Sequence, residues 1–188
     1  MSKIFFTSDL HFNHNKDFIW KARGYQSVEE MNEDFIKKWN SVVSNDDIVY
    51  VLGDVIMGED LNAGLRMLLK LKGKKYLAIG NHDTDARIKA FKANHIFEDI
   101  QMGYRIKAKK KTIILTHYPT VTANGEDTRT LNFYGHTHQT YDFFENKVYM
   151  YHVGVDSHNG YPVLLEDALQ NIHDKKYEIH EEERIMED

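Results

Sequence analysis

Cysteine is absent from this chain of 188 residues. Its absence excludes a disulfide framework, thiolate metal ligands and a catalytic thiol. Histidine is frequent instead, with eleven in the chain. A metal site in this protein would therefore use imidazole and carboxylate ligands.

Long apolar segments are also missing. The apolar run near the N-terminus, residues 4–6, is too short for a signal peptide. No other stretch approaches the roughly 20 apolar residues that cross a bilayer. We expect a cytoplasmic protein that does not contact a membrane.

The chain lacks an excess of basic residues as well. It has 24 Lys and Arg against 29 Asp and Glu, a net charge of −5. Tight binding to long nucleic acid is therefore not favoured, whereas a short or single-stranded nucleic acid stays open as a substrate. The composition is that of a globular protein. The length predicts one domain over residues 1–188, and no segment is long enough for a cap domain.

Apolar periodicity predicts an α/β order of elements. Ser27 and Glu30 form a capping-box pattern before the clearest helix. Helices are predicted over 28–43, 60–71, 84–93 and 162–172, and strands over 4–7, 47–52, 77–79, 104–107, 112–115, 131–134 and 148–155. Strands that first alternate with helices and later form hairpins predict an α/β sandwich of mixed strand direction.

Polar side chains follow five of the predicted strands directly. These residues are Asp9 and His11, then Asp54, then Asn81, His82 and Asp83, then His117, and finally His136 and His138. Sites in such sheets collect at the carboxyl ends of the strands. We therefore expect these side chains to meet in one place.

This set of imidazole, carboxylate and amide groups predicts a metal centre. It suits Mn, Fe, Zn, Co or Ni and suits magnesium less well. The groups outnumber the ligands of one ion, which favours two divalent ions about 3.5–4 Å apart with a bridging carboxylate over a single-zinc hydrolase. Such a pair is matched to phosphoryl transfer, and an uncoordinated histidine would protonate the leaving group.

The motifs at these strand ends resemble those of a known family. Asp9-x-His11, Gly53-Asp54, Gly80-Asn81-His82-Asp83, His117 and Gly135-His136-Thr137-His138 are similar to the five ordered motifs of the calcineurin-like metallophosphoesterases. The resemblance covers residues 7–138 and extends loosely to Gly154-Val155-Asp156. The segments Ser8-Asp9-Leu10-His11-Phe12, Met31-Asn32 and Trp39-Asn40 are similar to a small bacterial and phage branch of it.

The resemblance implies a fold and a role for each matching residue. The fold would be a four-layer α-β-β-α sandwich of two mixed sheets. Asp9, His11 and His138 would hold the first metal; Asn81, His117 and His136 would hold the second, with Asp54 bridging. His82 would be the catalytic histidine, and His82 and Asn81 would contact the substrate phosphate.

One departure from the family pattern concerns the catalytic histidine. The Asp54 motif continues Val55-Ile56-Met57, so the protein phosphatase branch's Asp three positions later and the Arg after it are missing. The usual carboxylate partner of the histidine is therefore absent, and phosphoprotein substrates are less expected. Whether Asp83 takes over the orienting role is open.

Residues outside the motifs supply further candidates. His14, Arg23 and Arg129 are candidate substrate contacts, in each case against a plain surface or structural role; Arg129 lies in a predicted loop over 120–130. Asp156 and His158 are candidate partners of the metal ligands, against a simple turn.

We therefore expect a hydrolase that cleaves a phosphodiester of a small nucleotide-like substrate by attack of a metal-bridging hydroxide, with Mn²⁺ as the expected metal. A phosphomonoesterase of the same fold and a non-catalytic metal-binding scaffold are the alternatives. The expected partner is a small phosphoester, a nucleotide or a nucleic-acid end, and no obligate protein partner is evident.

Overall fold

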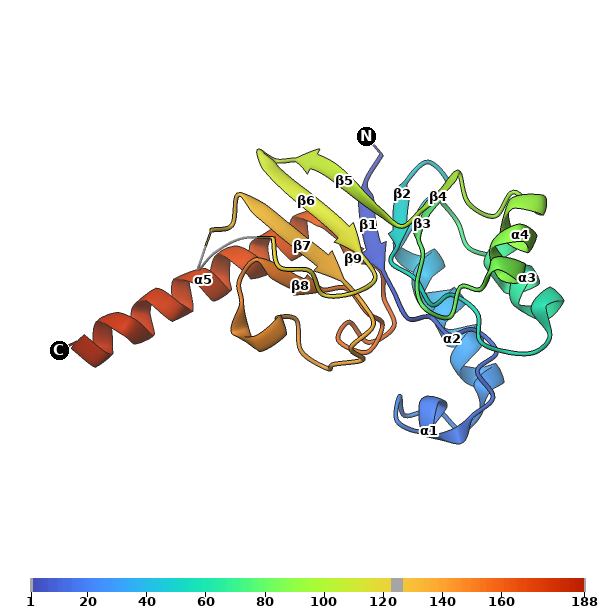
Figure 1. The fold of residues 1–188 in the computed structure, drawn as a ribbon. Helices are drawn as coiled ribbons and strands as arrows, with labels where there is room; N and C mark the ends of the chain where they lie inside the picture. Colours follow the sequence, from blue (N-terminus) through green and yellow to red (C-terminus); the bar gives the residue numbers. More distant parts are fainter. Residues whose placement is uncertain (1, 123–126, 188) are drawn as a thin grey trace.

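The computed structural model describes residues 2–122 and 127–187. It contains two mixed β-sheets, which pack against each other (Figure 1). Residues 123–126 of the predicted 120–130 loop lie outside the described residues. No helix in the described part of the chain combines the length and apolarity needed to cross a membrane.

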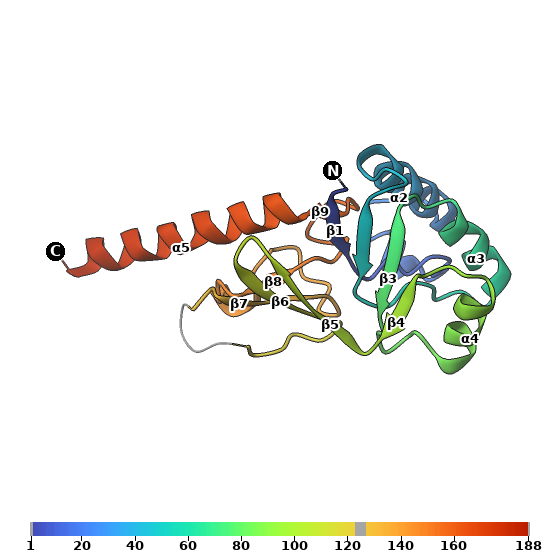
Figure 2. The same cartoon turned by 90° about the horizontal axis from the view of Figure 1, so that it is seen from above.

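The first sheet has the order β4-β3-β2-β1-β9. Its strands are β1 (Ile4–Thr7), β2 (Ile48–Val51), β3 (Lys74–Ala78), β4 (Asp99–Gln101) and β9 (Val163–Leu164). The first four run parallel and β9 is antiparallel to β1. Parallel strands need crossover connections, and helices α2 (Val28–Val42), α3 (Leu61–Leu69) and α4 (Asp85–Ala93) supply them on one face of the sheet (Figure 2).

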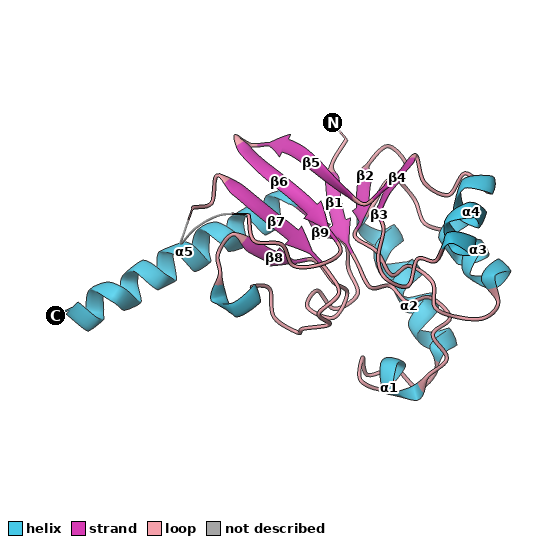
Figure 3. Cartoon of the chain, viewed as in Figure 1, coloured by secondary structure: helices cyan, strands magenta, loops and turns pink. Residues whose placement is uncertain are grey.

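The second sheet has the order β5-β6-β7-β8. Its strands are β5 (Gly103–Ala108), β6 (Lys111–Thr116), β7 (Thr130–Tyr134) and β8 (Met150–His152). The predicted hairpin forms between β5 and β6, whereas β6, β7 and β8 run parallel. The remaining helices are α1 (Asp17–Trp20), the short η1 (Phe144–Asn146) and the long α5 (Leu165–Glu187) (Figure 3).

Helix α2 shows how the sequence specifies its element. The Ser27 hydroxyl accepts a hydrogen bond from the Glu30 amide at 3.1 Å, as an N-cap should. The Glu30 carboxylate accepts one in return from the Gln26 amide at 2.7 Å, one residue before the position that a capping box predicts. Met31 and Trp39, on the apolar stripe of the helix, are buried against the sheet.

Two apolar cores lie on the two faces of the first sheet. Phe5 belongs to the core under α2, α3 and α4. Phe6 points the other way into the core between the sheets, where its ring meets that of Phe133 edge-on at 4.9 Å. Leu165 and Ile172 of α5 close this second core. The predicted α/β sandwich of two mixed sheets is confirmed.

The C-terminal segment differs from the prediction. The predicted helix over 162–172 begins only at Leu165 and continues to Glu187. The reason is that Val163 and Leu164 pair with β1 as a short strand before the helix starts. Figures 1 and 2 show the second half of α5 extending away from both sheets.

Candidate metal centre

The predicted site residues follow the carboxyl ends of strands from both sheets. Asp9 and His11 come after β1, Asp54 after β2, Asn81 and His82 after β3, His117 after β6, and His136 and His138 after β7. The structure brings six of them into two groups, each with its possible ligand atoms within 4.8 Å of one another. Asn81 joins the second group through a contact of 2.8 Å with His117.

Glycine allows the strand ends to approach this closely. A Cβ atom on Gly53, whose φ is +88°, would lie 2.6 Å from the Gly80 Cα atom. A Cβ atom on Gly135 would lie 2.6 Å from the Asp9 carboxylate. Any side chain at these two positions would therefore push the ligand loops apart.

The backbone at the site is strained. Five of the predicted ligands have positive φ, namely Asp9 at 59°, His11 at 48°, Asp54 at 56°, His136 at 68° and His138 at 49°. A non-glycine residue in this region costs of order 1–3 kcal/mol. Such strain is held at functional sites when the surrounding contacts over-determine it, and here it aims the side chains toward one another.

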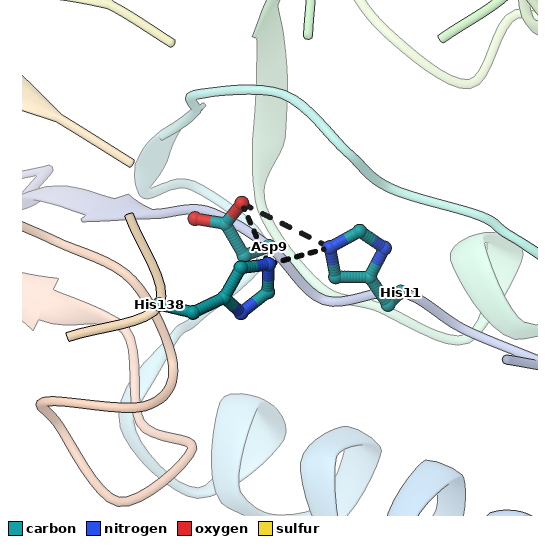
Figure 4. Close-up of side chains that lie close together, drawn as sticks. All are labelled: Asp9, His11 and His138. Atoms are coloured by element: carbon teal, nitrogen blue, oxygen red, sulfur yellow. Dashed lines mark hydrogen bonds and ion pairs between the residues drawn. The ribbon is translucent and has the colours of Figure 1, made fainter. Parts of the chain in front are cut away.

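The first group consists of Asp9, His11 and His138, whose side chains converge (Figure 4). The two imidazole Nε2 atoms are 3.1 Å apart, and Asp9 Oδ1 lies 3.9 and 3.8 Å from them. Asp9 Oδ1 is buried and has no hydrogen-bond partner among the described residues. Burial lowers the pKa of His11 to about 2, so its ring is neutral. A buried carboxylate oxygen without a donor, beside two ring nitrogens, fits a cation.

Asp156 and Arg23 support this first group through hydrogen bonds. Nδ1 of His138 lies 2.8 Å from the Asp156 carboxylate, and this contact directs Nε2 toward Asp9. The Arg23 guanidinium donates to both Asp156 oxygens at 2.8 and 3.0 Å and to the Asp9 carbonyl at 2.8 Å. Burial alone would lower the pKa of His138, but the hydrogen bond to Asp156 and the charge of Asp9 raise it overall. Burial alone would raise the pKa of Asp156, but His138 and Arg23 hold it well below its usual range.

The second group consists of Asp54, His117 and His136. His117 Nδ1 lies 2.8 Å from the Leu52 carbonyl, which can only accept, so Nδ1 carries the proton. In the neutral ring the Nε2 lone pair then faces two other acceptors, Asn81 Oδ1 at 2.8 Å and Asp54 Oδ2 at 3.5 Å. Converging lone pairs repel one another, and a cation between them would remove the conflict.

The Asp54 carboxylate lies between the two groups. Its Oδ2 is 3.7 Å from His11 Nε2 in the first group and 3.5 Å from His117 Nε2 in the second. Its Oδ1 accepts a hydrogen bond from the His82 amide at 2.8 Å. The two groups could therefore share this one carboxylate.

His82 stands at the open side of the site. Its side chain is 42% exposed, and its Nε2 lies 3.9 Å from Asp54 Oδ2. Arg87 of α4 donates to the His82 carbonyl and, at 3.1 Å, to the Met57 carbonyl, which fixes the backbone there. Arg87 was not predicted from the sequence; the only signal for it was its position five residues after His82, inside a predicted helix.

Asp83 has a role that the sequence left open. Its buried carboxylate accepts hydrogen bonds from the amides of Gly80 and Asp54, both at 2.9 Å, and of Val55 at 3.2 Å. Burial raises its pKa, and these amides partly oppose the increase. Asp83 therefore ties the loops after β2 and β3 together, and its oxygens bind backbone amides rather than the imidazole of His82.

The other predicted contacts divide into three outcomes. The His14 ring lies 5.7 Å from that of His11, at the border of the site. Arg23 is nearly buried, and its donors are engaged by Asp156 and backbone carbonyls, which favours a structural role; its role as a phosphate ligand stays a prediction. His158 Nε2 contacts the His152 carbonyl at 2.8 Å, and the other side chains it meets are those of Asp142 and Tyr151.

Arg129 as a substrate contact also stays a prediction, and its position does not favour it. It precedes β7 and pairs with Asp127, whereas His136 follows the other end of that strand. A residue that the sequence analysis missed does lie at the site: the half-exposed Tyr118, whose ring is 4.6 Å from that of His136.

Comparisons with known proteins agree with the motifs. The family model of the calcineurin-like phosphoesterases matches residues 2–182. An uncharacterised protein of Methanocaldococcus jannaschii is 35% identical over 88% of this chain and 89% of its own length. The Gene 66 protein of Mycobacterium phage L5 is 30% identical over 98% and 99%.

A solved structure shares the fold. A protein of unknown function from Aquifex aeolicus has a TM-score of 0.68 over 90% of this chain and 99% of its own, at 22% identity. The family is metal-dependent, and two Asp/His groups of this chain could hold its ions. On its motifs, its fold and its relatives, this chain belongs to the calcineurin-like phosphoesterases.

Proposed function

We propose that this protein hydrolyses a phosphodiester with the help of two divalent metal ions. The observation that carries the proposal is the Asp54 carboxylate, which lies within 3.7 Å of a ring nitrogen from each ligand group. A carboxylate shared in this way is the arrangement that a two-metal site needs. The partnerless oxygen of Asp9 supports it further.

Each ion would be held by residues from more than one strand end. The first would take Asp9, His11 and His138, and the second Asn81, His117 and His136, with Asp54 shared between them. Nitrogen and oxygen ligands without sulfur favour Mn²⁺, with Fe, Zn, Co and Ni compatible. When bound, such a pair activates a water molecule and neutralises charge on the phosphate oxygens.

His82 is the proposed acid. Its exposed ring reaches the site beside Asp54, so it can face the substrate while its amide anchors to Asp54 Oδ1. It donates a proton to the oxygen of the leaving group as the ester bond breaks. The Asn81 amide nitrogen is free of the His117 contact and can donate to a phosphate oxygen.

A diester is favoured over a monoester because the site is open. Asn81, His82 and His136 sit at its mouth, and the first and last are exposed. A substrate with a group on each side of the phosphate therefore finds room on both. A small nucleotide-like diester, or a nucleic-acid end, meets this requirement.

The test is hydrolysis of a diester and a monoester reporter by the manganese-loaded protein. We expect faster turnover of the diester, and a loss of about 10²-fold or more for His82→Ala with bound metal unchanged. His95→Ala, at an exposed histidine after α4, is the matched control and should leave the rate unchanged. Faster turnover of the monoester would favour the phosphomonoesterase. If the unmodified protein binds metal but turns over neither reporter faster than His82→Ala does, the result would favour the non-catalytic metal-binding scaffold.

A further inference from the structure

A cavity of about 580 Å³ lies beside the metal centre. It is formed by the segment after β1, the start of α2, the segment after β2 and the start of α3. The residues that line it include Asn13, His14, Glu29, Met57, Glu59 and Ala63. Its size is in the range of 300–1,000 Å³ that holds small molecules.

The cavity adjoins the side of the site where His82 stands. The His14 ring on its wall lies 5.7 Å from the His11 ring, and the His11 ring lies 5.6 Å from that of His82. The Arg87 guanidinium donates hydrogen bonds both to the carbonyl of Met57, which also lines the cavity, and to the carbonyl of His82. A group that leaves the phosphate on the His82 side therefore has this cavity next to it.

The wall of the cavity is held in place before any ligand arrives. The buried side chain of Asn32 accepts from the Asn13 amide at 3.3 Å and donates to the Asn13 side chain at 3.2 Å. Asn13 itself has a positive φ of 63°. A Cβ on Gly58 would lie 2.5 Å from the Asn13 Cβ, so the two loops are in close contact. Ligand sites are usually preformed in this way.

The chemistry of the lining selects against anions. Val28, Met57 and Ala63 provide apolar surface. Across the part of the chain that the structure describes, the carboxylates of Glu29 and Glu59 have neither a hydrogen-bond nor an ion-pair partner. They can therefore accept hydrogen bonds from a ligand. The lining also contains the carboxylate of Asp60 and a single lysine, Lys16, so negative charge exceeds positive charge and a leaving group with a further phosphate would be repelled.

We propose that this cavity receives the leaving group of the diester and that it selects an uncharged nucleoside. The aromatic ring of the nucleoside packs on the apolar surface, and its amino and hydroxyl hydrogens are donated to the carboxylates and amides. A leaving group that carries further phosphates is excluded. The proposal rests on the proposed function, and binding of the nucleoside can be measured apart from turnover.

Binding is tested by NMR titration of the zinc-loaded protein with adenosine, since Zn²⁺ is a d¹⁰ ion and leaves the spectrum diamagnetic. We expect saturable shifts of the amides around Met57 and Ala63. Ala63→Met fills the cavity and should weaken binding by about tenfold or more. Asn62→Met, at the exposed neighbour on the same helix, is the control and should bind as the parent does. Absence of these shifts, or equal binding by Ala63→Met, overturns the proposal.

Selection against charge is tested by kinetics on two substrates. One is a dinucleoside monophosphate, and the other carries an added terminal phosphate on the leaving nucleoside. We expect kcat/KM to fall by about tenfold or more for the second, because like charges meet in the cavity. The double variant Glu29→Lys with Glu59→Lys should remove this difference. Glu181→Lys, at an exposed residue of α5, should preserve it.

The outcomes separate the two proposals. Adenosine binding without hydrolysis of either substrate would reject the proposed function and leave the cavity as a nucleoside site. Equal hydrolysis of both substrates without adenosine binding would reject the nucleoside site and leave the phosphodiesterase.

Discussion

The two ligand groups of the site are similar in composition and different in their supports. In the first group His138 is held by the Asp156 carboxylate, which Arg23 holds in turn. In the second group His117 is held by the neutral Leu52 carbonyl. Burial does not distinguish the two groups: in each the carboxylate and one histidine are buried and the other histidine is exposed, and the second group adds the exposed Asn81.

If the site holds the two ions proposed above, this difference in supports should give the ions different affinities. Both supports fix the proton on Nδ1 and leave Nε2 for a metal, but a carboxylate also makes the ring a stronger base. The first group moreover contains the buried charge of Asp9, while the second offers the neutral oxygen of Asn81. We therefore expect the first ion to bind more tightly and the second to exchange more readily.

The largest effect is expected from Asp54→Asn, which removes the charge that lies between the two groups. The bound metal should fall from two ions per chain to about one, because the second group then has no carboxylate. Turnover should fall by about 10³-fold or more, because the loss of a metal ion should cost more than the loss of a single hydrogen-bond donor to the transition state. Metal analysis and diester kinetics measure both effects.

The control for this variant is Asp127→Asn. Asp127 pairs with Arg129 just before β7, at the end of that strand opposite to His136. This substitution changes the net charge equally and should keep both ions. Two bound ions in Asp54→Asn would show that the carboxylate is not shared.

Arg23→Gln should break the charged support of the first group. The side chains of Arg23 and Asp156 are only 7% and 11% exposed. Removal of one partner from a pair this buried costs about 3–5 kcal/mol of unfolding free energy. Denaturant unfolding at constant metal measures the loss. Arg66→Gln, at a largely exposed pair, is the control, and equal stability of the two variants would contradict a structural role for Arg23.

Asp156→Asn should weaken only the first group. The amide keeps the size of the side chain but loses its charge, and such a change typically lowers metal affinity by 10–100-fold. A competitive titration with a chelator resolves the two affinities. If both fell by the same factor, the separate support of the two groups would be wrong.

Arg129→Gln should have the smallest effect. Arg129 is 87% exposed and lies at the far end of β7 from the site, so kcat and KM should both stay unchanged. Steady-state kinetics on the diester check this, and a raised KM would support Arg129 as a substrate contact.

The motifs at the strand ends could be predicted from the sequence because they are local. Asp9 and His11 follow an apolar strand, and the same pattern recurs after four other strands. Their meeting follows from the rule that parallel strands present their carboxyl ends together. The main helices were equally predictable from their apolar periodicity.

The supports of the site could not be predicted because their partners are distant in the sequence. Arg23 binds both the Asp9 carbonyl and the carboxylate of Asp156, and Asp156 is 133 residues from Arg23 along the chain. The end of the sheet at which Arg129 lies could not be predicted, because the sequence does not reveal that β7 runs parallel to β6. Arg129 therefore lies at the end of the sheet where β7 begins, whereas His117 lies at the opposite end, where β6 ends. The two-residue strand β9 is too short to give a periodic signal.

The most direct test of the two-metal centre is electron paramagnetic resonance of the protein at increasing Mn²⁺. We predict saturation at two ions per chain and a spectrum of an exchange-coupled pair, because Asp54 would bridge ions about 3.5–4 Å apart. Saturation at one ion, or two ions with uncoupled signals, would contradict the shared carboxylate on which the account depends.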